Sequence, residues 1–178
     1  SLYQDLKKWT EAESCFRKSL EVNPHDLYAT ERVGTLKEAR LDEDLKKSRE
    51  EIDQLKAQGQ DSTEAEGRLK QKEDAILKFK VDEYDRRVKA HPTDYELKLK
   101  YGGLLRQVGR HDDAIKEFQK SVKDPKYKIP SLNMTGMCFL DKNLPDVADA
   151  QFQQALHAIA DKDSELGKEI KYNLGVVN

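Results

Sequence analysis

The sequence predicts an all-α fold in which antiparallel helix pairs stack into an α-solenoid, with a long antiparallel coiled-coil hairpin inserted in one pair. Three observations support this fold class. Apolar residues recur at helical spacing through most of the 178-residue chain. One pattern of small and aromatic residues returns after about 34 residues. Residues 42–58 are rich in charge and contain no glycine or proline, which is typical of a solvated helix.

The clearest helix pair is expected in residues 93–126. Residues 95–108 carry apolar side chains at helical spacing, and Gly109 supplies the positive φ that a helix end prefers. A second apolar stripe runs through residues 112–122, and Pro125 is expected to end that helix. Neither helix is long enough to be stable alone. The pair therefore predicts further copies of itself, against which each apolar stripe can be buried.

A second copy of this pair is expected in residues 127–160, where Gly136 corresponds to Gly102 and Phe152 corresponds to Phe118. Glycine in the middle of a helix costs about 1 kcal/mol relative to alanine, so its recurrence predicts a close approach of the paired helix. The alanines that would approach from the opposing helix are Ala12, Ala114, Ala148 and Ala155. The aromatic residues expected to fill the gap between successive repeats are Phe16, Tyr84, Phe118 and Phe152.

Both ends of the chain match incomplete repeats. Residues 1–26 match the second half of a repeat through Tyr3, Trp9, Ala12, Phe16, Ser19 and Pro24. Residues 161–178 match a first helix through Tyr172, Leu174 and Gly175. We therefore expect residues 1–178 to be a single domain from a longer repeat array, with an apolar face at the last helix that supports end-to-end self-association. That face would contain Ile170, Leu174 and Val177.

The repeat in residues 27–92 departs from the pattern, because the turn expected near Leu41 is missing. Residues 41–80 instead predict a coiled-coil finger that extends both helices by about 30 Å at 1.5 Å per residue. Its outgoing apolar positions are Leu41, Leu45, Ile52 and Leu55, and its returning ones are Ala65, Leu69, Ile76 and Phe79. The break between the two helices is expected at Gly59 to Ser62.

The register of the finger can be tested within the sequence, because facing residues of an antiparallel pair have a nearly constant sum of residue numbers. The apolar positions pair with sums of about 120, and the same register places the polar gap residues Ser48 and Lys72 opposite each other. A rival interpretation is that residues 41–80 form two degenerate repeats with four short helices. A continuous helix through Leu41 distinguishes the two.

These recurring residues resemble the tetratricopeptide repeat. The resemblance implies a right-handed superhelix whose first helices line a concave groove, which holds an extended peptide or a helix of a partner protein. Carried over position by position, the groove residues would be Arg32, Thr35, Leu99, Lys100, Arg106, Gln107, Asn133, Met134, Met137, Tyr172 and Asn173. Arg32, Lys100 and Arg106 would form a cationic rim. Met134 and Met137 would either form an adaptable apolar floor or pack in the core.

The best-known specialisation of this family is a two-carboxylate clamp that holds the C-terminal end of chaperones. The lysine, asparagine and arginine positions of that clamp are occupied by other residues here, namely Glu31, Thr35, Leu99, Gly103 and Met134. We therefore do not expect this chain to bind chaperone tails.

No catalytic, cofactor or metal site is expected. The four histidines share no ligand spacing, and the glycines form no phosphate-binding loop. A net charge of -2 argues against a nucleic-acid partner, and no apolar stretch approaches the length of a membrane span. Cys15 and Cys138 are expected as small core residues. The first residues do not resemble a signal peptide, which favours a cytoplasmic location.

The sequence thus favours a non-enzymatic scaffold that binds a protein or peptide partner in the groove. The alternative is a structural or assembly protein in which the finger mediates docking or oligomerisation. In that case the important residues would be Leu45, Ile52, Leu55, Leu69, Ile76 and Phe79.

Overall fold

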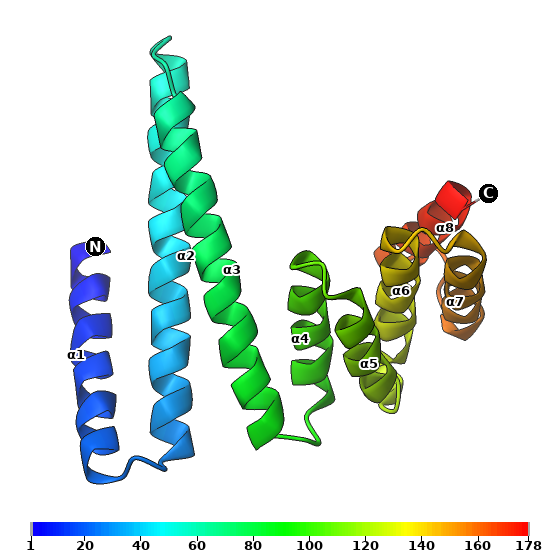
Figure 1. Cartoon of the computed structure of the whole chain (residues 1–178), viewed down its shortest axis with the longest axis horizontal. Coiled ribbons are helices and arrows are strands. Elements are labelled where there is room, and N and C mark those ends of the chain that lie inside the picture. The colour runs from blue at the N-terminus through cyan, green and yellow to red at the C-terminus, as the bar shows by residue number, and fades with distance from the viewer. Residues whose placement is uncertain (1, 178) are drawn as a thin grey trace. The chain divides into compact units, whose positions relative to one another are not determined.

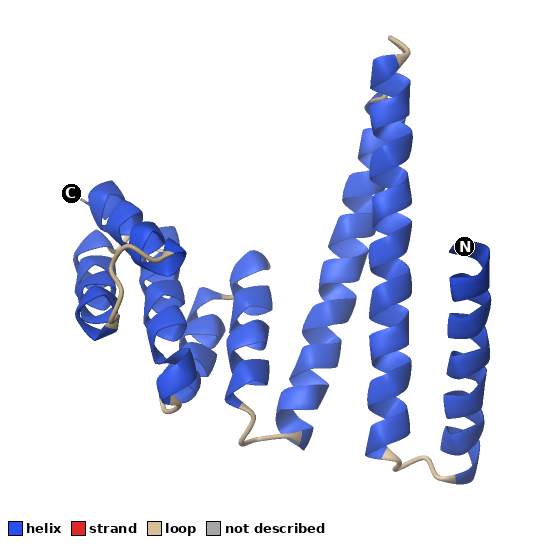
Figure 2. Ribbon diagram, turned by 180° about the vertical axis from the view of Figure 1, so that it is seen from behind, coloured by secondary structure: helices blue, strands red, loops and turns tan. Residues whose placement is uncertain are grey.

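The computed structural model describes residues 2–177, and the side chains of residues 8–177, so the side chain of Tyr3 lies outside the described part. The described residues form eight α-helices and no strand (Figures 1 and 2). The helices are α1 (Leu2–Val22), α2 (Leu27–Ala57), α3 (Thr63–Ala90), α4 (Tyr95–Gln107), α5 (His111–Ser121), α6 (Pro125–Asp141), α7 (Pro145–Ala158) and α8 (Glu165–Val177).

The chain divides into two compact units, Ser1–Glu83 and Tyr84–Asn178, and the division falls within α3. In the first unit, α1 packs against α2, and the ring of Phe16 meets that of Tyr28 edge to face at 6.0 Å between centroids. The turn between these helices is closed by Asp26, which is the N-cap of α2 and accepts a hydrogen bond from the Ala29 amide at 3.0 Å.

The long helices of this unit are uninterrupted. Helix α2 passes through Leu41 without a break, which excludes the rival interpretation of four short helices. Gly59, with φ of 68°, lies in the turn before α3. Lys72 donates a hydrogen bond to the Ser48 hydroxyl at 2.9 Å, so the two polar gap residues face each other as expected. Coiled-coil packing of the pair stays a prediction.

The second unit contains α4 to α8, and each helix packs against the next one along the chain. Asp94 caps α4 by accepting from the Leu97 amide at 3.0 Å. Gly109 lies in the turn that follows α4 and has a φ of 76°, as predicted. Pro125 has a different role from the expected one. Helix α5 already ends at Ser121, and Pro125 begins α6, where its missing amide hydrogen has no intrahelical partner to lose.

Pairing of the helices in this unit depends on two close contacts between glycine and phenylalanine. A Cβ on Gly102 would lie 2.5 Å from Cε1 of Phe118, and one on Gly136 would lie 2.5 Å from Cε1 of Phe152. Both rings have 0% exposure. The expectation that these rings fill the gap between successive repeats was therefore incomplete, since each ring also lies directly on the glycine of its own repeat.

Hydrogen bonds that involve buried polar side chains join neighbouring repeats. The hydroxyls of Ser121 on α5 and Ser131 on α6 are 2.8 Å apart, and both residues have 0% exposure. The Tyr101 hydroxyl of α4 donates to the Asp85 carboxylate of α3 at 3.1 Å. Burial, reinforced by this carboxylate, raises the pKa of Tyr101 to about 12. These bonds satisfy polar groups that would otherwise be costly to bury.

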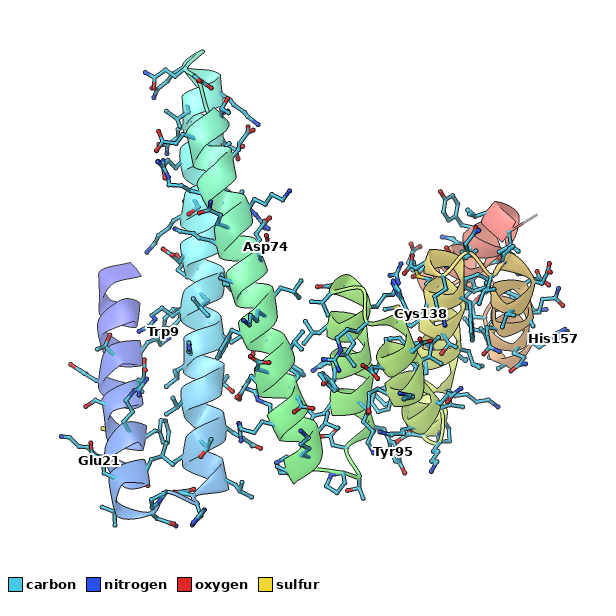
Figure 3. The ribbon with its side chains drawn as sticks, viewed as in Figure 1. Trp9, Glu21, Asp74, Tyr95, Cys138 and His157 are labelled. Atoms are coloured by element: carbon cyan, nitrogen blue, oxygen red, sulfur yellow. The ribbon has the colours of Figure 1, made fainter. Side chains whose placement is uncertain are left out.

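The cysteines have opposite environments. Cys138 on α6 is fully buried (Figure 3), as expected of a core residue, and its burial raises the pKa of the thiol to about 11. Cys15 was also expected in the core, but it lies on an exposed part of α1. The prediction from helical spacing was wrong for Cys15 because α2 covers only part of the circumference of α1.

We predict that Gly102→Ala and Gly136→Ala each destabilise the chain by about 1–3 kcal/mol, because the added methyl group overlaps a fully buried phenylalanine ring. Gly103→Ala is the matched control. It lies on the same helix, and its new Cβ would meet only the Met134 methyl group at 3.9 Å. The free energies of unfolding from urea titration should separate the two classes, and equal effects at Gly102 and Gly103 would contradict the role of the ring contact.

We also predict that the chain loses stability in alkaline solution. The ordinary pKa values are 9.0 for Cys138 and 10.0 for Tyr101, and the folded values are about 11 and about 12. The unfolded chain therefore releases these protons first, so the stabilisation is complete below pH 9 and is lost as the pH rises through the folded values. Urea titrations at a series of pH values should show this decrease, and the double variant Cys138→Ala, Tyr101→Phe should show a flatter profile.

Candidate functional site

The expected groove residues of the second unit lie mainly on one side of α4 and α6. Leu99, Gly103 and Arg106 are spaced by one helical turn on α4, and Met134 and Asp141 are spaced by two turns on α6. The two helices meet along these rows. The end of the Met134 side chain lies 3.9 Å from the position that a Cβ on Gly103 would take. We call this surface the α4–α6 face, and we include Met137, which is partly exposed but also packs against the core cluster of Phe152 and Ile170.

A bidentate ion pair closes one end of the face. Arg106 of α4 bonds Asp141 of α6 through Nε at 2.6 Å and through Nη2 at 3.3 Å. Both side chains are only partly exposed, at 25% and 32%. His111, the first residue of α5, places its Nδ1 3.7 Å from the same carboxylate. Asp141 thus lies where three helices meet, and a planar pair of this kind holds its partners in a defined geometry.

The other end of the face carries a second polar cluster. Glu96 receives a hydrogen bond from the Tyr127 hydroxyl at 2.8 Å and pairs with the Lys100 ammonium at 2.7 Å. The nearby ammonium and then the hydroxyl hold the pKa of Glu96 below its usual value, while the carboxylate raises the pKa of Lys100. Lys100 and Arg106 were expected as a cationic rim. Each is instead matched by a carboxylate of the chain itself.

Two expected groove residues are buried between helices. Asn133 of α6 and Asn173 of α8 have exposures of only 2% and 6%. The Asn173 amide donates to the Asn133 carbonyl oxygen at 3.0 Å, and the Asn133 amide donates to Glu169 at 2.8 Å. Their polar atoms therefore fasten α8 to α6, and they are not displayed to a ligand. Met134, Met137 and Leu99 remain partly exposed, and Gln107 is exposed.

The last helix corrects another expectation. Ile170, expected in an exposed apolar face, has 0% exposure and belongs to a core cluster with Phe152 and Ala155. Leu174 and Val177 are partly buried against the same cluster. The exposed apolar side chains of α8 are Tyr172 at 73% and Val176 at 57%. The helix is rotated from the expected orientation because Ile170, at the centre of its apolar stripe, fills the space against α7.

The first unit places the remaining expected residues on its own helices. Arg32 is exposed and stacks over the ring of Tyr28 at 5.0 Å from the centroid. The Thr35 hydroxyl bonds the Glu31 carbonyl oxygen at 2.9 Å within the helix. In the finger, Ile52 and Ile76 are buried. The other expected finger residues, Leu45, Leu55, Leu69 and Phe79, are partly buried.

Several contacts at the site could not be read from the groove pattern. The Arg106–Asp141 and Tyr127–Glu96 pairs join residues about one repeat apart. Opposite charges one period apart were the available signal for the first pair, and the second has no such signal because tyrosine is uncharged. Among the described residues, no group of three or more histidine, cysteine, aspartate or glutamate side chains is placed to hold a metal ion. Within residues 2–177, none of the helices has both the length and the apolar character needed to cross a membrane.

Comparison with known proteins adds a family match and a fold. A family model described as tetratricopeptide repeat matches residues 1–26. No curated protein sequence matches the chain. Among solved structures, the chain is similar to YrrB, described as a tetratricopeptide repeat protein with an unusual peptide-binding site. That likeness has a TM-score of 0.53 at 17% identity and covers 96% of this chain and 87% of YrrB.

Two further solved structures have lower TM-scores. One is a thermophilic tetratricopeptide repeat protein of Thermus thermophilus, with 0.48 at 18% identity over 97% of this chain and 94% of that one. The other is MamA, with 0.48 at 21% identity over 87% and 85%. At such low identities a likeness shows only the fold. The YrrB comparison, with a TM-score of 0.53, is the one that supports this fold. A tetratricopeptide repeat model thus matches residues 1–26, and the chain shares the helical-repeat fold of YrrB.

Proposed function

We propose that the α4–α6 face binds a peptide or helical segment of a partner protein, and that the chain acts as a non-enzymatic scaffold. The observation that carries this proposal is the partly exposed apolar strip of Leu99, Met134 and Met137, in which the end of Met134 lies beside Gly103. Gly103 adds no side chain, so a ligand can approach the helix backbone closely at this point. The flexible thioethers can adapt to the shape of the bound side chains.

The charges of the face indicate which segment it accepts. Arg106 is paired with Asp141, and Lys100 is paired with Glu96. An acidic peptide would have to compete with these internal carboxylates for either cation. A segment with neutral, apolar side chains does not compete with these carboxylates. Burial of the apolar strip contributes about 25 cal/mol of free energy per Å² of apolar surface removed from water. We therefore propose an apolar segment as the ligand, held between the two polar clusters.

The tetratricopeptide repeat match at residues 1–26 and the helical-repeat fold support this role, because proteins of this fold present extended surfaces to partners. YrrB, which shares the fold, is described as having a peptide-binding site. The proposal for this chain rests on its own α4–α6 face, since the likeness at 17% identity extends to the fold alone.

The test is to select peptides from a random displayed library against the wild-type chain and to measure their affinities by fluorescence anisotropy. Leu99→Asp places a charge in the apolar strip, and Gly103→Leu fills the space beside Met134. We expect each variant to weaken binding of the selected peptides by roughly tenfold or more. Gly67→Leu is the control, because Gly67 lies on α3 with nothing within 4 Å of its Cβ position. Selected peptides that bind all three variants like the wild type would refute the site.

The alternative function places recognition on the finger of residues 41–80. The large apolar side chains in this segment are at least partly buried. Its outer surface carries ion pairs such as Arg49 with Glu73 at 2.8 Å and Lys56 with Glu66 at 2.8 Å. Exposed pairs of this kind are worth little each, so docking through the finger would be polar and sensitive to salt.

Deletion of residues 42–79, with the helices rejoined by a short turn, separates the two functions. We expect the shortened chain to remain helical by circular dichroism and to bind the selected peptides within about twofold of the wild type, because the α4–α6 face lies outside the deleted segment. Loss of peptide binding in a chain that is still folded would favour the finger as the recognition element.

A further inference from the structure

Both methionines of the chain lie on the α4–α6 face. Met134 and Met137 are the only methionines in the 178-residue sequence, and they are three residues apart on α6. This spacing places them about one turn apart on the same side of the helix. Both side chains are partly exposed. The thioether groups of the chain are therefore concentrated on the surface that we propose as the binding site.

The two methionines differ in what they contact. Met137 packs against the core cluster that contains Phe152 and Ile170. The end of Met134 lies instead beside Gly103, at 3.9 Å from the position that a Cβ would take there. Gly103 has no side chain that could cover Met134. We therefore expect a small solute to reach the sulfur of Met134 more readily than that of Met137.

The two thiols of the chain are placed differently from the thioethers. Cys138 follows Met137 in the sequence, but it is fully buried (Figure 3). Burial also raises the pKa of its thiol to about 11, so the reactive thiolate is scarce at neutral pH. Cys15 is exposed, but it lies on α1 in the first unit. On α4 and α6, the sulfur atoms open to an oxidant are thus those of the methionines.

Oxidation changes the chemical character of these side chains. A hydroperoxide transfers one oxygen atom to the thioether sulfur, so that an S–O bond forms and the O–O bond breaks. The sulfur is oxidised by two electrons, and the peroxide is reduced to water or an alcohol. The product, methionine sulfoxide, is polar, and its oxygen needs a hydrogen-bond donor when it is buried. Lys100 and Arg106, the cations at the two ends of the face, already have carboxylate partners. An apolar segment that covers the sulfoxides would therefore remove their water at a cost in binding free energy.

We propose that Met134 and Met137 form a reversible oxidation site, at which a hydroperoxide converts the α4–α6 face from a state that binds its apolar segment to one that releases it. This inference rests on the proposed function of the face. With both thioethers reduced, the strip is apolar and adapts to the bound side chains. With sulfoxides at the same positions, the strip is polar and the segment loses its apolar contacts. Methionine sulfoxide reductases reverse the change, so binding can be restored in the same molecule.

The first test requires no ligand. The full chain with Cys15→Ser, which removes the exposed thiol, is treated with hydrogen peroxide at neutral pH and mapped by mass spectrometry. We expect Met134 and Met137 each to gain one oxygen atom, Met134 at the faster rate, while Cys138 stays unmodified. The same chain unfolded in guanidinium chloride gives the oxidation rates of fully exposed side chains. Strong protection of both methionines in the folded chain would overturn the proposal.

The second test measures the affinity of the library-selected peptides for the Cys15→Ser chain before and after oxidation. We expect oxidation to weaken binding by roughly tenfold or more, and treatment with sulfoxide reductases for both epimers to restore it. The matched control adds Met134→Leu and Met137→Leu, which keep apolar side chains at both positions but have no thioether. Whatever the starting affinity of this control, peroxide should not change it. An oxidised chain that binds the peptides as tightly as the untreated one would overturn the proposal.

A further variant separates loss of binding from loss of folding. Met137→Leu confines oxidation to Met134, so the methionine that packs against the core cluster stays unmodified. This chain should keep its helices by circular dichroism after peroxide treatment and should still lose affinity for the peptides. Selected peptides that tolerate Leu99→Asp would refute the proposed function and this inference together. Peptides that Leu99→Asp weakens but oxidation does not would overturn this inference alone.

Discussion

The helix pairs of residues 84–178 depend on one steric constraint, which is that a phenylalanine ring lies where a glycine has no Cβ. Phe118 on Gly102 and Phe152 on Gly136 bring the two helices of each pair close enough to exclude any larger residue at the glycine. The mid-helix glycine costs roughly 1 kcal/mol of helix stability, and burial of a whole aromatic ring offsets that cost. Once the pairs are fixed, the remaining apolar side chains pack around them, as Ala148, Ala155 and Ile170 do around Phe152.

Polar contacts then fix how neighbouring repeats sit on one another within this unit. The Ser121–Ser131 contact joins α5 to α6, and the Asn133–Asn173 hydrogen bond joins α6 to α8. An apolar contact tolerates sliding along its length, whereas a buried amide or hydroxyl is satisfied in only one register. The same principle shapes the α4–α6 face, where Arg106 and Lys100 pair with internal carboxylates and the space between them is left to Leu99 and the methionines.

The repeat pattern predicted much of this architecture because it consists of local rules. Helical spacing and a positive φ at Gly109 each depend on a few neighbouring residues, and both are present. The continuous helix through Leu41 was foreseen for the same reason, since no residue in that stretch breaks a helix. Pro125 was misjudged because proline both follows one helix and begins the next, and the choice depends on where α5 ends.

Fewer features of the candidate site could be predicted from the sequence. The repeat register assigned Asn133 and Asn173 to an open groove, but the contact between α6 and α8 buries them, and the register contains no information on how each helix is rotated about its axis. Similarly, a sequence shows that Arg106 and Asp141 carry opposite charges, but only the approach of α4 to α6 pairs them.

By itself, then, the sequence determined that this chain is built of helix pairs with glycine and phenylalanine at repeated positions. Helix periodicity and the spacing of these residues both depend on short stretches of the chain. The tertiary structure decided which cations are neutralised and which asparagines are buried. Both depend on distances between residues that are far apart in the chain, such as Asn133 and Asn173, and only the packing of whole helices sets those distances.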